Sequence, residues 1–147
     1  MIDKATGAIQ IADGCVIRPG MTKADFNALW EADLCRVLHA RGDSAYLGSS
    51  YRARFVDGQG RELVLTVGFA DERVSPVGLH YLLPGETDPN SPTATWTEDN
   101  ERERQALHDA ILQEWLGDPP HVYPWGRVQS VYDSRSAFSE IRVAYNA

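Results

Sequence analysis

Short runs of alternating apolar and polar residues, each bounded by Gly, Pro or Asp, recur through most of this 147-residue chain. Period-two alternation between turn residues predicts β-strands joined by hairpins. The pair Asp13-Gly14, set between two such runs, is typical of a tight hairpin turn. Pro76 cannot donate a ladder hydrogen bond, so its strand is expected to start late or to lie at an edge. The predicted strands are residues 8–12, 15–18, 51–56, 63–67, 74–83, 125–132 and 138–145.

Two segments have helical periodicity instead of alternation. The first helix is predicted over residues 23–40, because Thr22 and Asp25 form a capping-box pattern and apolar residues follow at steps of three and four. Gly42 then provides a stop signal. This helix would separate the first hairpin from the strands that follow it.

The second predicted helix begins after Thr95 or Thr97, either of which can cap it. Acidic residues fill its first turn, where the helix dipole favours negative charge. Its apolar stripe begins at Leu107, and Gly117 ends the helix before two prolines that cannot continue it. The pattern therefore predicts a helix of about five turns before the last hairpin.

These elements predict one α+β domain over residues 1–147, in the order β-β-α-β-β-β-α-β-β. The two helices are expected to pack on one face of a mostly antiparallel sheet. Residues 84–95 contain three prolines and almost no large apolar side chain, so they are predicted to form a long loop. We do not interpret this loop as a domain linker, because neither flank has enough apolar pattern for a second core.

The chain carries 21 acidic and 14 basic side chains, a formal net charge of −7 at pH 7. Residues 84–118 hold nine of the acids and only two of the bases, so the whole imbalance lies in this segment. An acidic balance argues against nucleic acid as a partner, because phosphate binding needs clustered Lys and Arg. Clustered acidic charge instead favours a basic protein partner, while an ordinary solvated helix face is the alternative interpretation.

The first part of this acidic segment is the predicted partner-binding surface. Trp96 lies where the loop meets the helix, and it is either a hydrophobic staple or an exposed anchor for a partner. The acids at the helix start have polar surroundings in the sequence, which argues against a buried general acid. The predicted contact residues are Glu86, Asp88, Trp96, Glu98, Asp99, Glu101 and Glu103.

Motifs for catalysis or metal binding are absent from the sequence. The four histidines lack metal-ligand spacing, and His108 and Asp109 would point about 100° apart on a helix. No phosphate-binding Gly-rich loop, nucleophile elbow or calcium-binding loop occurs. A Cys–His nucleophile pair would need Cys15 or Cys35 beside a histidine, and no family signature surrounds either thiol. We therefore expect no catalytic residue, no metal and no cofactor.

Cysteine usage and hydropathy bear on the compartment. Two cysteines are too few for a disulfide framework, so buried reduced thiols are expected at Cys15 and Cys35. No apolar run reaches the length of a membrane span, and the first residues lack the basic and apolar regions of a signal peptide. These features predict a cytoplasmic protein that does not bind membranes, and they leave its oligomeric state open.

The last third of the chain contains four stretches that together form a recognisable pattern. They are Glu101–Arg104, His108–Pro120, Tyr123–Asp133 and Ile141–Tyr145. This pattern resembles small bacterial proteins in which a helix of the type HDxWLxxxLGxPP precedes a WGxxxSVYD segment and a final strand. Such proteins resemble the immunity side of polymorphic or type VI secreted toxin systems. The resemblance implies binding to a cognate toxin and brings no catalytic residues with it.

The sequence therefore favours a cytoplasmic immunity protein that neutralises a basic toxin by occluding or distorting the toxin's active site. Two other functions remain open. One is a small ligand-binding domain or enzyme with a pocket between sheet and helices, lined by His80, Tyr51 or Cys35. The other is an adaptor or chaperone of a secretion apparatus, which would bind its partner without inhibiting it.

Overall fold

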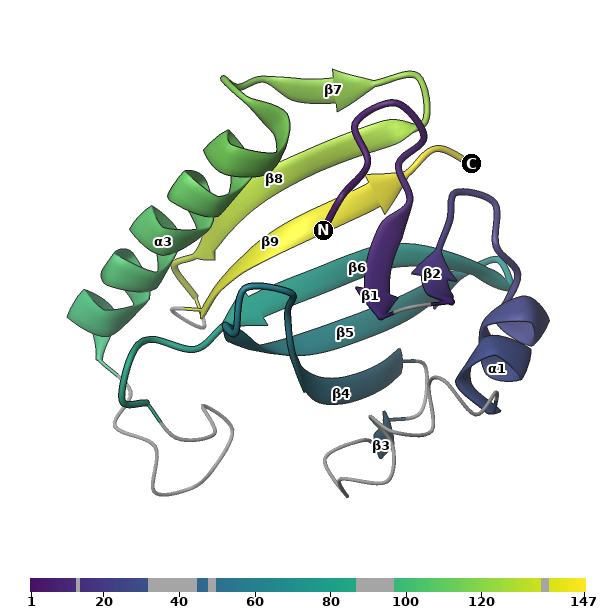
Figure 1. Ribbon diagram of the computed structural model, residues 1–147, viewed down its shortest axis with the longest axis horizontal. Coiled ribbons are helices and arrows are strands. Elements are labelled where there is room, and N and C mark those ends of the chain that lie inside the picture. Colours follow the sequence, from purple (N-terminus) through teal and green to yellow (C-terminus); the bar gives the residue numbers. More distant parts are fainter. Residues whose placement is uncertain (13, 32–44, 48–49, 87–96, 136–137) are drawn as a thin grey trace.

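A seven-stranded antiparallel sheet forms the centre of the protein, as the computed structural model in Figure 1 shows. The structure describes residues 1–12, 14–31, 45–47, 50–86, 97–135 and 138–147. The strand order is β3-β4-β5-β6-β9-β8-β7, so the last hairpin joins the first strands through β6 and β9. The strands are β3 (Ala45–Leu47), β4 (Ser50–Val56), β5 (Glu62–Ala70), β6 (Arg73–Tyr81), β7 (His121–Tyr123), β8 (Gly126–Asp133) and β9 (Phe138–Tyr145).

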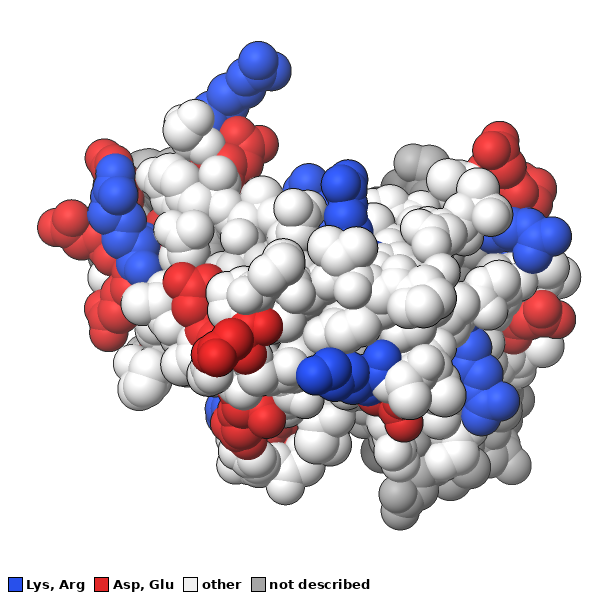
Figure 2. Space-filling model, turned by 90° about the horizontal axis from the view of Figure 1, so that it is seen from above, with Lys and Arg blue, Asp and Glu red and all other residues white. Residues whose placement is uncertain are grey.

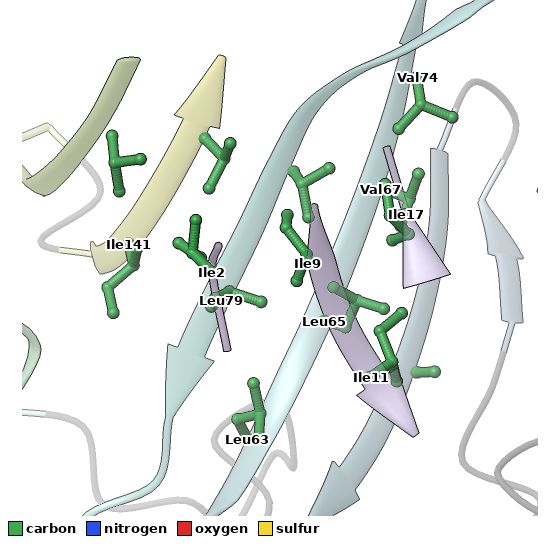
Figure 3. Packing of buried hydrophobic residues seen from close by; sticks show 14 of the residues in the cluster. Ile2, Ile9, Ile11, Ile17, Leu63, Leu65, Val67, Val74, Leu79 and Ile141 are labelled. Carbon is green, nitrogen blue, oxygen red and sulfur yellow. The ribbon is translucent and has the colours of Figure 1, made fainter. Parts of the chain in front are cut away.

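A separate hairpin lies across one face of the sheet (Figure 1). Its strands are β1 (Ile9–Ala12) and β2 (Cys15–Ile17), which pair antiparallel. Figure 3 shows Ile9 and Ile17 of this hairpin above Leu65 and Val67 of the sheet, and all four side chains are buried. Each fully buried aliphatic side chain of this kind stabilises the fold by about 1.5–3 kcal/mol.

Helix α1 (Lys23–Glu31) follows this hairpin. The Asp25 N–H donates to Thr22 Oγ1 at 3.0 Å, and the Thr22 N–H donates to Asp25 Oδ2 at 3.2 Å. The predicted capping box is therefore confirmed. Phe26 anchors the helix in the core, where its ring meets Tyr51 edge-on.

Helix α3 (Glu98–Leu116) packs on β8, β9 and β6. Thr97 caps it, since the Thr97 hydroxyl accepts the Asn100 N–H at 3.0 Å. Gly117 ends it with a φ of 81°, a conformation that glycine adopts without steric cost. The two ends of this helix are thus fixed by the residues that the sequence indicated.

Burial alternates clearly along β9, whereas the central strands β5 and β6 also bury residues of the other face, among them Val64 and His80. In β9, Ile141 and Val143 are buried beneath α3 and the first hairpin, whereas Phe138 and Arg142 on the opposite face are exposed. The predicted α+β class, with two helices on one face of a mostly antiparallel sheet, is confirmed. The short strands β3 and β7 were not predicted.

The expectation for the strand that contains Pro76 is wrong. β6 begins at Arg73 and is a central strand, paired with β5 on one side and β9 on the other. Pro76 is accommodated because the β5–β6 ladder shifts between Val67 and Phe69, and because β9 pairs only with Val77–Leu79. Proline is tolerated inside a sheet at such an irregularity.

Some predictions fall on residues that the structure does not describe. The first helix is described only to Glu31, so its predicted end near Ala40 and its stop at Gly42 are not tested. The same holds for Asp13 and for residues 87–95 of the predicted loop.

Candidate protein-binding surface

The seven predicted contact residues divide into three groups in the structure. Glu98, Asp99 and Glu103 are exposed on the first turns of α3. Glu86 and Glu101 instead turn inward toward Arg104, and Glu101 is only 2% exposed. Asp88 and Trp96 lie outside the described residues. Glu101 must therefore be removed from the predicted contact surface, because a partner cannot reach it.

Arg104 is the centre of a buried ionic cluster. Its guanidinium binds Glu86 in a bidentate manner, with Nη1–Oε2 at 2.7 Å and Nη2–Oε1 at 2.6 Å. Its Nε donates to Glu101 Oε1 at 3.2 Å, and its Nη1 also donates to the Tyr81 carbonyl oxygen. Arg104 is 1% exposed, so this arrangement compensates its charge almost entirely inside the protein.

The two carboxylates respond differently to the same arginine. Burial acts to raise the pKa of Glu86, but hydrogen bonds from Arg104 and from the Leu83 N–H outweigh it and hold that pKa below its usual value. For Glu101 burial dominates, and its pKa is raised despite Arg104 and the Ser139 N–H, which donates to Glu101 Oε2 at 3.1 Å. The expectation that none of these acids is buried is therefore wrong for Glu101.

His108 extends the cluster from α3 to two strands. The Tyr81 N–H donates to His108 Nε2 at 3.1 Å, so the proton of the neutral ring lies on Nδ1, which is 3.2 Å from Ser139 Oγ. Burial, followed by His80 and Arg104, lowers the pKa of His108 to about 3. This histidine is therefore a neutral structural group that ties α3 to β6 and β9.

His80 lies in the same region but on the other face of β6. Its ring stacks on Phe138 with centroids 4.5 Å apart, and its Nδ1 is 2.7 Å from the Ser139 carbonyl oxygen. Burial, followed by the charge of Arg104, lowers the pKa of His80 to about 4. The prediction of structural, hydrogen-bonded histidines agrees with these contacts of His80 and His108, whereas His39 lies outside the described residues.

Ser139 and His108 are within the distance of a nucleophile–base pair, but both are fully buried. A substrate atom cannot approach Ser139 Oγ without displacing α3 or β9. No group of metal-ligating residues is found among the described residues. The cluster thus serves to position the helix, and its outward neighbours are the groups that a partner can touch.

The outward side of α3 carries mostly acidic groups. Arg102 is the one basic side chain exposed on this helix, where its Nη2 donates to Glu98 Oε1 at 2.9 Å and its guanidinium lies over the Tyr132 ring. Figure 2 shows acidic and basic side chains interleaved on the α3 side of the view from above, with an uncharged stretch in its middle. The exposed acids of α3 and the residue pair after it are Glu98, Asp99, Glu103, Asp109, Glu114 and Asp118.

Glu114 connects this surface to the turn between β4 and β5. Its carboxylate accepts from Gln59 Nε2 and lies 3.5 Å from Arg61 Nη1. Arg61 Nε in turn donates to Asp57 Oδ2 at 2.8 Å, and the Tyr81 hydroxyl donates to the same oxygen at 3.1 Å. Burial raises the pKa of Tyr81, so the hydroxyl stays protonated and donates.

The surface of the described residues includes the following hollows. The first, of about 780 Å³, is formed by the N-terminal segment, β2 and Trp125. The second, of about 580 Å³, lies between α3 and the β7–β8 hairpin. The third, of about 460 Å³, lies between the β4–β5 turn, residues 82–86 and α3. Neither His80 nor Tyr51 lines any of the three, although the sequence placed a possible pocket at these residues.

Cys15 departs from the sequence expectation. It is fully buried, as predicted, but it is disulfide-bonded rather than reduced. Cys35 lies outside the described residues. No helix within the described ranges combines the length and the apolar character needed to cross a membrane.

The buried ionic cluster was missed at the sequence level, although a signal for it was present. The inward stripe of α3 extends from Ile111 back through His108 and Arg104 to Glu101 at steps of three and four. The predicted stripe began at Leu107, because only apolar residues were considered. Comparison with protein-family models, with curated proteins and with solved structures finds no match for this chain.

Proposed function

We propose that this chain is an immunity protein that binds a basic protein toxin through the outward side of α3. One observation supports the proposal above the others. Helix α3 and the two residues after it expose six acidic side chains but only one basic side chain, because the second arginine, Arg104, is buried. An excess of one charge sign on a surface accelerates association with a partner of the opposite sign.

The buried cluster makes this surface rigid. Arg104, Glu101 and His108 bind α3 to residue 81 of β6 and residue 139 of β9 at three consecutive inward positions. Side chains on the opposite side of the same turns, such as Asp99 and Glu103, are therefore held on a fixed backbone. A preorganised surface loses less conformational entropy on binding than a flexible one.

The toxin of a polymorphic or type VI secretion system is the partner that the sequence resemblance suggests. The direct experiment mixes this protein with the toxin encoded beside it and measures complex formation by size-exclusion chromatography at micromolar concentration. A co-eluting complex that also abolishes the toxin's activity supports the proposal. Separate elution of the two proteins at that concentration would rule the pairing out.

Growth protection separates an immunity protein from a secretion adaptor. Cells that express the toxin are expected to survive when this protein is co-expressed, because an inhibitor occupies or distorts the active site. An adaptor or chaperone would form a complex in the chromatographic experiment but leave the toxin active. Complex formation without protection would therefore favour the adaptor.

Small-ligand binding is a second candidate function, favoured by the hollow of about 460 Å³ beside Tyr81. Arg54, Arg61 and Leu107 also line it, together with Glu62 and Glu86. Both arginines are ion-paired, Arg54 with Glu62 and Arg61 with Asp57. A small carboxylate with an apolar body would bind here by replacing Glu62 as the partner of Arg54. Thermal-shift measurements with a panel of small carboxylic acids test this function, and replacing Arg54 by Met is expected to remove any shift they produce.

The compartment is also a proposal, and two observations about it disagree. The sequence favours the cytoplasm, whereas disulfides such as the one at Cys15 persist mainly in oxidising compartments. Labelling of thiols in protein taken from cells without added reductant distinguishes them. Labelling of Cys15 would support the cytoplasm, and its protection until a reductant is added would support an oxidising compartment.

A further inference from the structure

The outer edge of β8 is only partly covered by its neighbour β7. β8 pairs with β9 along all eight of its residues, Gly126–Asp133. On the other side, β7 pairs only with Gly126, Arg127 and Val128. Among the described residues, no strand continues this pairing beyond Val128. The edge from Gln129 to Tyr132 is therefore open.

The hairpin geometry identifies which main-chain groups face this open edge. Tyr123 and Gly126 close a two-residue loop, so they form a hydrogen-bonded pair, and such pairs recur at every second residue. The Asn146 N–H donates to the Trp125 carbonyl oxygen, which places the odd-numbered residues of this strand toward β9. The N–H and C=O groups of Ser130 and Tyr132 consequently point away from β9, toward the open edge.

The chain cannot cover this edge by extending β7 backward. The β7–β8 register places His121 opposite Val128, so a continued ladder would bring Pro119 opposite Ser130. Proline has no N–H and cannot donate to the Ser130 carbonyl oxygen. The two prolines before β7 therefore leave Ser130 and Tyr132 without a strand partner in the described part of the chain.

A groove meets this edge at Gln129 and Ser130. It is the hollow of about 580 Å³, with β8 residues Gln129 and Ser130 on one side and α3 residues Asp109, Leu112 and Gln113 on the other. Figure 1 shows α3 running alongside β8 below β7. Ser130 Oγ is also buried and has no hydrogen-bond partner. The groove thus contains a main-chain donor, a main-chain acceptor and a hydroxyl at the same residue.

We propose that this groove binds an extended peptide segment of a protein partner, which adds to the sheet as a strand beside Ser130–Tyr132. The unpaired N–H and C=O groups match the main chain of an extended peptide, which is the chemistry of β-strand addition. A polar side chain of the peptide can satisfy Ser130 Oγ. The open stretch of four residues limits the added strand to a short segment.

This inference does not depend on the acidic surface or on the toxin. The groove contains one acid and one base, Asp109 and Arg127, so it selects by main-chain pairing rather than by net charge. A second copy of this chain is a different occupant, and its binding is an outcome that the experiment must distinguish. Edge strands that lack a partner are known sites of both kinds of pairing.

The experiment uses random dodecapeptides displayed on phage and selected on the folded protein. The enriched peptides are then synthesised and added to isotope-labelled protein, and amide hydrogen exchange is measured by NMR. We expect the exchange of the Ser130 and Tyr132 amides to slow by tenfold or more on peptide binding. The amides of Gln129 and Val131, which face β9, serve as internal controls that are slow with and without peptide.

Two variants test the same groove in different ways. Ser130→Pro removes the open-edge N–H and is expected to weaken peptide binding by at least tenfold, with circular dichroism verifying the fold. Asp109→Trp fills the groove from an exposed helix position, and Ala24→Trp, exposed on α1, is its matched control. We expect the first tryptophan variant to lose binding and the second to retain it, which tests the groove even where the proline variant does not fold.

Three results would overturn the proposal. The first is a selection that enriches no peptide for the native protein over Asp109→Trp. The second is peptide binding that leaves the Ser130 and Tyr132 amides in fast exchange. The third is concentration-dependent protection of these amides without peptide, which would show that a second copy of the chain occupies the edge.

Discussion

The two sides of helix α3 use the same residue types for opposite purposes. On the inward side, Glu101 and Arg104 are buried and bonded to the sheet. On the outward side, Glu98 and Arg102 form an ion pair of the same chemistry in full contact with solvent. Because successive residues point about 100° apart, a shift of one position along the helix decides between a structural and a surface role.

This difference teaches that charge counted along the sequence is not charge on the surface. The segment 84–118 has two arginines and nine acids. One arginine, Arg104, is buried and forms its ion pairs with two of these acids, Glu86 and Glu101. The acids that remain outside then face a single arginine. The exposed surface of α3 therefore has a larger excess of acidic over basic side chains than the composition of residues 84–118 suggests.

Replacing the two arginines by methionine should separate the two sides most strongly. Arg104→Met leaves the buried Glu101 and the half-buried Glu86 without a cation, and we expect a loss of about 3–5 kcal/mol in the free energy of unfolding. Arg102→Met removes only a solvated pair, so no measurable loss is expected. Urea unfolding of both variants measures the difference. Equal stabilities would show that the buried cluster does not position α3.

Acid should destabilise the protein through two buried histidines, His108 on the α3 side of the sheet and His80 on its other face. Their pKa values, about 3 for His108 and about 4 for His80, lie below the value near 6.5 of an unfolded histidine. A depressed pKa means that the unfolded state takes up protons first, so stability is complete above pH 6.5 and decreases as the pH falls toward 4.

The size of this acid effect is on the order of 3 kcal/mol per histidine between pH 7 and pH 4. The raised pKa of Glu101 acts in the opposite direction and offsets part of it. Unfolding free energies measured at pH 7, 5.5 and 4 check the slope. His108→Gln should flatten it. A native protein with constant stability from pH 7 to 4 would refute the neutral, buried state of both rings.

A smaller difference in the free energy of unfolding is expected between variants of Glu101 and Glu103. Glu101→Gln keeps an acceptor for the Ser139 N–H but weakens the bond to Arg104, so we expect a loss of about 1–2 kcal/mol. Glu103→Gln changes only an exposed side chain and should leave the unfolding free energy unchanged. If Glu103→Gln destabilises the protein as much as Glu101→Gln, the division of α3 into two sides is wrong.

Local features of this fold were predictable from the sequence because their causes are local. The capping box of Thr22 and Asp25, the cap at Thr97 and the stop at Gly117 each depend on residues within one helical turn. The hairpins followed from alternation and turn residues. These interactions form wherever the segment folds, so a pattern of a few residues is sufficient to identify them.

The inward role of Arg104 depends instead on contacts with distant parts of the chain. Its partners include Glu86 and the Tyr81 carbonyl oxygen, 18 and 23 residues away, and Ser139 joins the cluster from β9. No local sequence pattern predicts that β6 and β9 become neighbours. The position of Pro76 in a central strand was missed for the same reason, since the ladder shift that accommodates it involves β5.

The association rate with the basic toxin is the most direct test of the proposal that the acidic outward side of α3 binds this partner. Asp99→Asn/Glu103→Gln removes two charges from the outward side of α3, and Asp71→Asn/Glu72→Gln removes two from the distant β5–β6 turn. We predict that the α3 variant associates at least about threefold more slowly in low salt, with the difference disappearing in high salt, while the turn variant keeps the native rate. Equal rates for the two variants would contradict an interaction through the acidic side of α3.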